Sequence, residues 1–352
     1  MNLIKYLFLL LNLAVVFALL ISYLAVFIPP DKLWFPSFFS LAYPIFVILN
    51  ILFIVLWMLF KPRFMLFSLI AVLLGFGFIT RYVQFGGNTT KSAGIKVVSY
   101  NVHSFSGNGV EEAKDNADNI LKFLDENNAD IICLQEARLR KNKIFNVAAA
   151  VKNMKSIDHY HYARTSETFG QLTLTRYPII HMGEIRYEKS RNMAIYTDVI
   201  IDSDTVRIFN VHLQSYKIDP GKYAIIDSPK IDEEKDIKEI REIGSKLKRA
   251  FQMRAEQVRE IKKVIDETPY PVIICGDFND TPVSYSYQQL RGDFNDAFIE
   301  SGRGFGRTYI GKLPSFRIDN IFYSDFFESF NFKAHNFRVS DHLPVSCVLI
   351  KN

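Results

Sequence analysis

The feature that most constrains this chain is a block of three apolar runs at its N-terminus, followed by a sequence of ordinary polarity. The first two runs, 7–28 and 38–60, contain no charged residue and reach the roughly 20 residues that a helix needs to cross a bilayer. The third run, 64–82, contains two glycines, and Thr80 and Tyr82 would have to complete its span. Residues 1–82 are therefore predicted to form an all-helical transmembrane region with about three helices.

Other interpretations of these runs stay open. The third run could be a buried core helix, which would leave two spans. The first run could be a cleaved signal peptide, but it is longer than the apolar part of such peptides. No small-residue cleavage site follows Pro29 and Pro30.

The charges between the runs predict an orientation. Lys5 flanks the first run, Lys61 and Arg63 separate the second from the third, and Asp31 and Lys32 cancel in the first loop. Because basic loops stay in the cytoplasm, an odd number of spans places the rest of the chain on the extracytoplasmic side. We thus expect a multi-pass protein of the cytoplasmic (inner) membrane. Three basic residues beyond the runs weakly oppose this orientation: Arg81, Lys91 and Lys96.

Residues 83–94 are rich in Gly and Thr and are predicted to be a linker, which leaves 95–352 as the globular domain. The net charge of +5 is small for a chain of 352 residues and is only weak support for an anionic partner. The three cysteines, Cys133, Cys275 and Cys347, have neither disulfide-like nor zinc-like spacing. We expect all three to be buried as apolar side chains.

Short apolar strands alternate with amphipathic helices throughout the globular part. Strands are predicted at 96–102, 130–135, 193–201, 206–213, 271–276, 318–323, 330–337 and 344–350, and helices at 112–127 and 233–267. Such a chain needs several layers to bury its apolar faces, which predicts an α/β sandwich with sheet packed on sheet and helices outside. A polar insert at 216–236 is expected to form a loop beside the site.

Polar side chains stand at the ends of several of these strands. They are Asn101, Glu136, His212, Asp277, Asn279, Asp319, Asp341 and His342. Individually each has an ordinary explanation: Asn101 as a turn residue, Glu136 as a solvated strand end, His212 as a buried core histidine. Together they provide hard oxygen ligands and a histidine supported by an acid, which is what metal-assisted hydrolysis of a phosphoester requires.

Six short motifs carry a resemblance to a known family. They lie at 99–102 (SYNV), 134–136 (LQE), 210–213 (NVHL), 276–279 (GDFN), 317–319 (RID) and 340–342 (SDH). In order and type they resemble the endonuclease/exonuclease/phosphatase superfamily over about residues 95–350. The resemblance implies a four-layer sandwich, with two packed mixed β-sheets flanked by helices, and a phosphoric ester hydrolase.

The resemblance also implies roles for the site residues. Glu136 would be the principal ligand of Mg²⁺, or of Mn²⁺, with Asn101 and Asp341 also at the metal. His342, oriented by Asp341 or Asp319, would activate the attacking water or contact the phosphate. Three further roles complete the set: Asp277 positions the nucleophile, Asn279 bonds a phosphate oxygen, and His212 stabilises the pentacovalent phosphorus or protonates the leaving oxygen.

Two departures from the family's pattern leave the substrate-side contacts open. Asn320 follows Asp319 where many relatives have an aromatic residue, and the segment 170–178 is richer in hydroxyl side chains. Neither departure removes a catalytic group.

The sequence thus predicts a membrane-anchored, Mg²⁺-dependent phosphohydrolase whose partners are the lipid bilayer and a phosphoester substrate. No protein partner is inferred. The substrate could be a lipid headgroup, a nucleotide or a nucleic acid. The alternatives are a membrane-tethered nuclease and a non-catalytic binding module on a hydrolase fold. The basic residues of 237–263 are interspersed with acids, which favours a small headgroup over duplex DNA.

Overall fold

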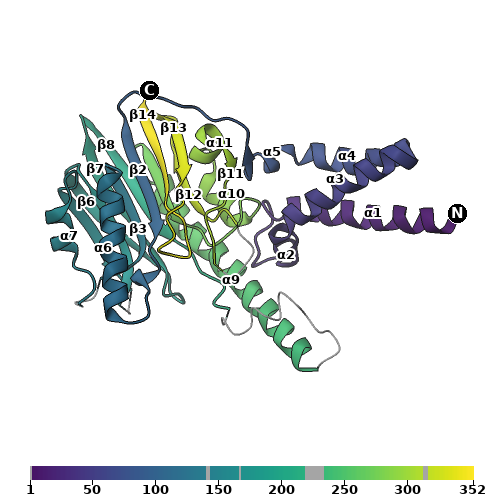
Figure 1. Ribbon diagram of the computed structural model, residues 1–352, viewed down its shortest axis with the longest axis horizontal. Helices are drawn as coiled ribbons and strands as arrows, with labels where there is room; N and C mark the ends of the chain where they lie inside the picture. The colour runs from purple at the N-terminus through teal and green to yellow at the C-terminus, as the bar shows by residue number, and fades with distance from the viewer. Residues whose placement is uncertain (1, 140–142, 166–167, 219–233, 312–315) are drawn as a thin grey trace.

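The computed structural model describes residues 2–139, 143–165, 168–218, 234–311 and 316–352. An apolar helical arm carries the N-terminus, and it is joined to a domain built on two six-stranded sheets (Figure 1). The polar insert predicted at 216–236 falls mostly outside the described residues, and only its two ends are seen.

One sheet has the strand order β13-β14-β2-β3-β5-β4. Its strands are β2 (Ile95–Asn101), β3 (Ile131–Arg138), β4 (His159–Arg164), β5 (Phe169–Thr175), β13 (Phe327–Ala334) and β14 (Val345–Lys351). The second sheet has the order β10-β12-β9-β8-β7-β6. Its strands are β6 (Ile179–Arg186), β7 (Met193–Ile201), β8 (Asp204–His212), β9 (Val272–Asp277), β10 (Asn295–Asp296) and β12 (Asp319–Tyr323). Both sheets are mixed, because β2 runs parallel to β3 and β8 runs parallel to β9.

The two sheets pack face to face, and helices cover their outer faces. The core between the sheets contains all three cysteines, Cys133, Cys275 and Cys347, which are buried and unpaired as predicted. Helices α6 (Val110–Glu126) and α7 (Val147–Asn153) cover the first sheet, and α9 (Glu234–Asp266) and α10 (Tyr285–Arg291) cover the second. The predicted four-layer α/β sandwich is confirmed.

Most of the predicted strands and both predicted helices form, with shifts of a few residues at their ends. The strand predicted at 330–337 begins earlier, at Phe327, because the segment from Phe327 pairs with the end of β14. The analysis of the sequence missed β4 and β6, edge strands whose half-exposed faces interrupt the alternation of polar and apolar residues. Short elements were not predicted either, among them α7, α10, β10, η1 (His103–Phe105), α11 (Ala297–Ser301) and β11 (Gly304–Phe305).

The arm contains α1 (Asn2–Leu24), α2 (Phe35–Leu41), α3 (Tyr43–Phe60), α4 (Pro62–Leu74) and α5 (Phe76–Ile79). Two helices are long and apolar enough to cross a membrane by length and composition: Leu3–Leu24 within α1, and α3. The segment 64–82 is not one helix, because it breaks at Gly75, where a Cβ would lie 2.1 Å from the Tyr23 hydroxyl oxygen. At about 20 Å, the 13-residue α4 is shorter than the hydrocarbon core of a bilayer.

The arm packs firmly against the domain. The Arg81 guanidinium donates to the Pro282 carbonyl and to Gln288, both at 2.9 Å. Arg259 of α9 forms a two-bond ion pair with Asp31 at 3.1 Å. The strand β1 (Val83–Gln84) pairs with β11, so the predicted linker 83–94 begins with residues held against the domain.

Candidate active site

The predicted site residues meet where strands of the two sheets end. Asn101 is the last residue of β2, and His212 and Asp277 are the last residues of β8 and β9. Those two parallel strands place His212 opposite Asp277. Asp319 begins the antiparallel β12 and also lies opposite Asp277. Residues far apart in the sequence therefore converge on one edge of the sandwich.

Glu136 reaches this edge through an irregularity in β3. The pairing between β3 and β5 shifts register between Leu134 and Ala137, and Glu136 has a φ of 56°. A β-bulge with a residue in the left-handed region redirects its side chain, and such strain is common at functional sites. The bulge thus brings the Glu136 carboxylate to within 3.5 Å of the His212 Nε2 atom.

The GDFN segment takes a tight path that only its own residues allow. Gly276 has a φ of 150°, and a Cβ there would lie 1.9 Å from the Val211 carbonyl oxygen. Asn279 has a φ of 51°, a conformation that Asn tolerates better than most residues. The Asn279 backbone N–H donates to Asp277 Oδ1 at 2.8 Å, which fixes the turn.

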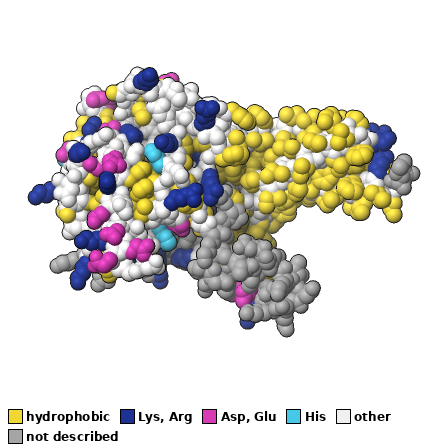
Figure 2. Space-filling view, viewed as in Figure 1, with side chains coloured by type: hydrophobic (Ala, Val, Ile, Leu, Met, Phe, Trp, Pro, Cys, Tyr) yellow, Lys and Arg dark blue, Asp and Glu magenta, His cyan; other side chains and the backbone are white. Residues whose placement is uncertain are grey.

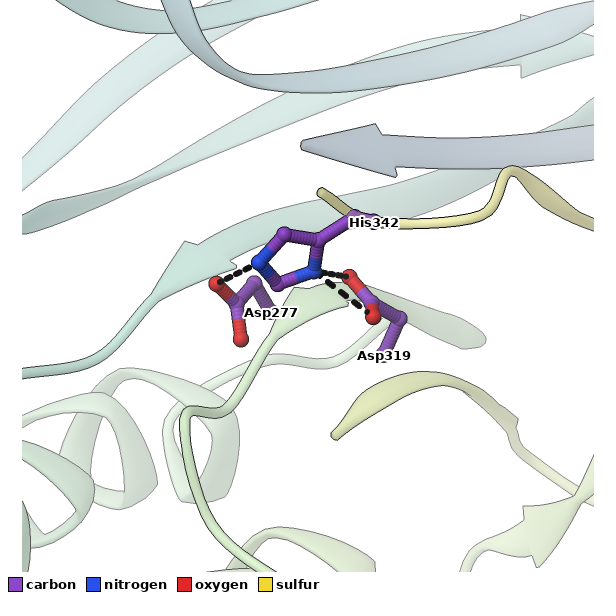
Figure 3. Close-up of side chains that lie close together, drawn as sticks. All are labelled: Asp277, Asp319 and His342. Atoms are coloured by element: carbon purple, nitrogen blue, oxygen red, sulfur yellow. Dashed lines mark hydrogen bonds and ion pairs between the residues drawn. The ribbon is translucent and has the colours of Figure 1, made fainter. Parts of the chain in front are cut away.

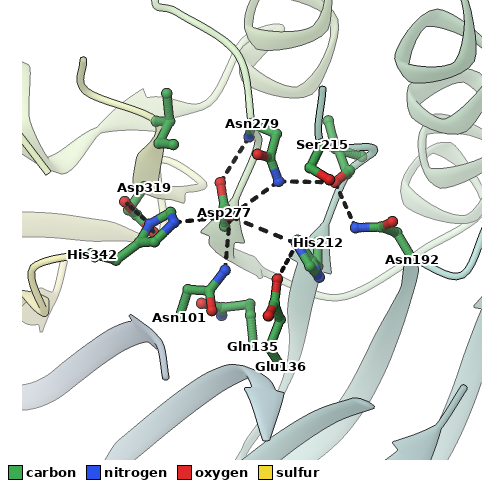
Figure 4. A network of polar contacts seen from close by, with 12 residues as sticks. Asn101, Gln135, Glu136, Asn192, His212, Ser215, Asp277, Asn279, Asp319 and His342 are labelled. Atoms are coloured by element: carbon green, nitrogen blue, oxygen red, sulfur yellow. Dashed lines mark hydrogen bonds and ion pairs between the residues drawn. The ribbon is translucent and has the colours of Figure 1, made fainter. Parts of the chain in front are cut away.

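Asp277 is the centre of the polar network (Figure 4). Its Oδ2 atom accepts hydrogen bonds from the side-chain amides of Asn101 at 2.9 Å and Asn279 at 3.1 Å. The same oxygen lies 3.7 Å from the Nε2 atoms of both His212 and His342. Burial raises the pKa of Asp277, and the positive charge of His342 opposes this shift. A carboxylate with a raised pKa that faces two histidines is suited to proton transfer.

His342 and Asp319 form a buried acid–imidazole pair (Figure 3). The Nδ1 atom of His342 lies 2.9 Å and 3.1 Å from the two carboxylate oxygens of Asp319. Burial by itself lowers the pKa of His342, but the charges of Asp319 and Asp277 outweigh burial and raise this pKa to about 10. His342 is therefore an imidazolium at neutral pH. Of the two acids considered from the sequence, the structure pairs Asp319 with it.

Asp341 faces another partner. Its carboxylate lies 3.4 Å from the Nδ1 atom of His103, a histidine that the analysis of the sequence did not single out. The Ser340 hydroxyl donates to the Asn101 carbonyl at 2.8 Å and so ties this loop to the end of β2. All eight predicted site residues are thus present around the same cleft or in direct contact with residues that line it.

The cleft has a volume of about 230 Å³. Its walls include Asn101, Glu136, Asp277, Asn279, Asp341 and His342, together with Tyr216, Lys217, Phe316 and Tyr309. Two sets of side chains could hold a cation here. Ligand atoms of Asp277, Asp319 and His342 lie within 4.8 Å of one another. The set expected from the sequence, Glu136, Asn101 and Asp341, also lines the cleft and offers hard oxygen atoms.

Sequence reasoning missed a polar network behind the cleft. The Gln135 side-chain amide donates to Asn210 Oδ1 at 2.9 Å, and the Asn210 amide donates to the Leu134 and Leu172 carbonyls at 3.1 Å. These buried bonds link the two sheets directly beneath Glu136. Both residues belong to motifs noted in the sequence, but neither was assigned a role, because a strand sequence does not reveal a partner in the other sheet.

Residues 98–342 match the Endonuclease/Exonuclease/phosphatase family. The chain belongs to this family. Residues 5–82 match a domain of unknown function, DUF8431. No curated protein matches the chain in sequence.

Solved structures with the same fold cover the domain but only part of the chain. A family protein from Leptotrichia buccalis is 14% identical, with a TM-score of 0.52, and the match covers 73% of this chain and 99% of that protein. TDP2 from Caenorhabditis elegans is 15% identical, with a TM-score of 0.51, covering 73% and 75% of the two chains. The human Nocturnin catalytic domain with bound sulfate is 15% identical, with a TM-score of 0.50, covering 74% and 94%. At these identities the likeness establishes the fold alone.

Proposed function

We propose that this protein is a divalent-metal-dependent phosphoester hydrolase anchored in a membrane. The observation that carries the activity is the cleft in which Asp277 faces two histidines while one of them, His342, is held by Asp319. Membership of the Endonuclease/Exonuclease/phosphatase family and its hydrolase fold support the same class of reaction. A non-catalytic module has less support, because Glu136, Asp277 and His342 line one cleft.

The chemistry of the donor set fits a divalent cation. Glu136, Asp341 and the Asn101 carbonyl oxygen are hard ligands, and four carboxylates stand in or beside the cleft, with His342 as a balancing cation. When bound, Mg²⁺ or Mn²⁺ would stabilise negative charge on the phosphoryl oxygens. The strained backbone of Glu136 is consistent with a side chain held in position for a ligand.

The protein's own residues would carry out the other steps of the reaction. Asp277 orients the attacking water and accepts its proton. The His342 imidazolium contacts the phosphate, which is the role its high pKa favours over that of a base. Asn279 is placed to donate to a phosphate oxygen. His212 is buried, and among the described residues neither of its ring nitrogens has a hydrogen-bond partner, so it remains available to the leaving oxygen.

A soluble aryl phosphodiester tests the activity in the full-length purified chain. We expect hydrolysis that needs a divalent cation, and His212→Ala should lower kcat by about 10² to 10⁴ with a smaller change in KM. His181→Ala, on the outer strand β6, is the matched control. The proposed role of His212 is refuted if its variant retains the turnover of the control.

The arm supports membrane anchoring. Few residues of the two candidate spans are buried, unlike those of a core helix in a soluble protein, and the exposed surface is almost entirely apolar (Figure 2). Lys5 and Arg63 both lie beside Phe64, and basic side chains gather at the end of the arm farthest from the domain (Figure 2). The positive-inside rule then puts this end in the cytoplasm and the domain on the extracytoplasmic side.

Fusing a reporter enzyme that works only in the cytoplasm to the C-terminus tests the orientation. We expect no signal from this fusion and a signal from the same reporter inserted between Lys61 and Arg63. The opposite pattern would invert the topology, and extraction of the protein by carbonate without detergent would rule out a spanning arm.

We also propose a small phosphoester, of the size of a lipid headgroup, in preference to duplex DNA. Binding a duplex requires clustered Lys and Arg to neutralise several phosphates. On α9 the basic side chains of Lys246, Lys262 and Lys263 are paired with acids on the same helix. A duplex preference of tenfold or more in kcat/KM, falling steeply as salt rises, would establish the nuclease alternative.

A further inference from the structure

A second, larger cavity lies between the arm and the domain. It has a volume of about 590 Å³, within the range of ligand-binding cavities, and its lining is overwhelmingly apolar. Phe38, Ala42 and Val47 line it from the arm, and Ile243 and Leu247 of α9 line it from the domain. An apolar space of this size favours a hydrocarbon ligand, because polar groups placed in it would lose their hydrogen bonds.

This apolar cavity adjoins the catalytic cleft. Tyr216, Ile218 and Phe316 line both spaces. Tyr216 also packs edge-on against Phe251 of α9, which in turn contacts Phe38 of the arm. One molecule could therefore place a polar group among the catalytic residues and an apolar group beneath the arm.

The apolar cavity also borders the surface that would face lipid. Ile45 and Ile48 line it, yet they are 59% and 57% exposed on the outside of α3, one of the two candidate spans. Trp34 lies near the boundary between arm and domain, where the Lys248 ammonium is 4.8 Å from the centre of its ring. Amphipathic aromatic and basic side chains are typical of the membrane surface. With the arm in a bilayer, the cavity would lie at the level of the leaflet adjacent to the domain.

Each of the two spaces has a cation in its lining. The exposed Arg307 lines the apolar cavity, and Lys217 lines the catalytic cleft. A third cation, Arg317, is neutralised by a buried ion pair with Asp296 at 2.7 Å. Arg307 would favour an anionic group beside an apolar chain.

We propose that the substrate is a phosphoester lipid of the adjacent leaflet, with its phosphate in the catalytic cleft and a hydrocarbon chain in the apolar cavity. This inference rests on the proposed function and identifies its substrate class. In the reaction a water oxygen bonds to phosphorus and the bond from phosphorus to the leaving oxygen breaks. One water proton goes to Asp277, and protonated His212 gives a proton to the leaving oxygen. Transfer of the Asp277 proton to His212, 3.7 Å away, then restores both groups. The hydrocarbon chain takes no part in the reaction and contributes only to binding of the substrate.

A series of alkyl 4-nitrophenyl phosphates with methyl, butyl and octyl chains tests this proposal, since every member releases the same chromophore. The full chain in nanodiscs would be used. Burial of each methylene favours binding, so kcat/KM should rise at least about tenfold from methyl to octyl. Equal values along the series would overturn the proposal.

Variants that fill the cavity locate the effect. Ala42→Phe and Leu247→Trp should each reduce the octyl-to-methyl ratio of kcat/KM at least about fivefold, because the added ring occupies the space of several methylenes. Ala14→Phe, on an exposed position of α1, should keep the ratio of the unmodified protein. The proposal would be overturned if both cavity variants kept the octyl-to-methyl ratio of kcat/KM and melted within a few degrees of the unmodified protein. The hydrocarbon chain would then bind elsewhere.

A binding measurement separates this inference from the proposed function. Trp34 packs against Phe38 of the cavity, at 5.5 Å between ring centres, so a brominated octyl phosphonate bound there should quench its fluorescence saturably. Trp57→Phe removes the other tryptophan's signal. If no phosphoester is hydrolysed, the proposed function fails. Saturable quenching that Ala42→Phe abolishes would still support binding of a hydrocarbon chain in the cavity. Quenching that rises linearly and is the same in Ala42→Phe would overturn it.

Discussion

The arm and the domain expose opposite kinds of side chain (Figure 2). Between the sheets of the domain the core is made of valines, isoleucines and cysteines, and charged groups cover much of the outer surface (Figure 2). In the arm, Asn12, Asn50 and Ser68 are fully buried, while leucines and phenylalanines cover the outside. Asn12 donates to Ser68 at 2.6 Å and accepts from the Trp57 indole at 3.0 Å.

The difference shows which solvent each region suits. In water, the burial of apolar surface drives the packing of the two sheets. In lipid that driving force is absent, and buried hydrogen bonds and close packing hold helices together. The two regions are therefore stabilised by different interactions, and each of the following experiments perturbs one region.

The largest effect should come from Glu136→Gln, which keeps the shape of the domain but removes the principal proposed metal ligand. We expect loss of activity by at least about 10³, and similar loss in excess chelator, because stabilisation of phosphoryl charge depends on that ligand. Hydrolysis of the soluble phosphodiester measures it. Glu328→Gln, on the exposed part of β13, should be indistinguishable from the unmodified protein. Full activity of the unmodified protein in chelator would contradict the metal requirement.

A smaller but more specific effect should follow Asp319→Asn. The pKa of His342 is about 10, so the imidazolium and its contribution are present at neutral pH and are lost as pH rises through that value. Removing the Asp319 charge should lower this pKa and shift the alkaline limb of the kcat profile to lower pH. At neutral pH, kcat should fall about 10²-fold. An unchanged alkaline limb would mean that another group controls it.

The domain should also lose stability in acid through His161. Burial lowers the pKa of this histidine to about 4, below the roughly 6.5 of the unfolded chain. Between these values the unfolded state binds the proton and the folded state does not, so the free energy of unfolding falls as pH drops, by about 2 kcal/mol. Both tryptophans lie in the arm, so melting of the strands would be followed by circular dichroism. His161→Gln should flatten the pH dependence and His159→Gln should not.

The smallest effect belongs to the interior of the arm. Asn12→Ala removes hydrogen bonds to Ser68 and Trp57, and in a bilayer it should lower the stability of helix association by about 0.5–2 kcal/mol. Trp57 fluorescence in lipid measures it. Leu13→Ala, which shortens an exposed apolar side chain, should change little. A larger loss for Leu13→Ala than for Asn12→Ala would show that the arm is packed as in a soluble protein.

Many elements were predictable because their information is local. The apolar strands that end at Asn101 and Asp277 are short runs with polar residues at fixed positions, and both form within a residue or two of the expected bounds. The sequence also contains Gly75, but it does not show that a helix ends there. Gly75 leaves room for the Tyr23 ring, which comes from another helix.

The sequence alone determined the apolar N-terminal block, the four-layer sandwich and the set of eight polar residues, since each depends on residue type and spacing along the chain. The tertiary structure decided that His342 pairs with Asp319, with Asp341 facing His103 instead. It also decided that Gln135 and Asn210 join the sheets and that an apolar cavity adjoins the cleft. These features join residues from distant segments. Their energies depend on distance and burial, which sequence spacing does not specify until the chain has folded.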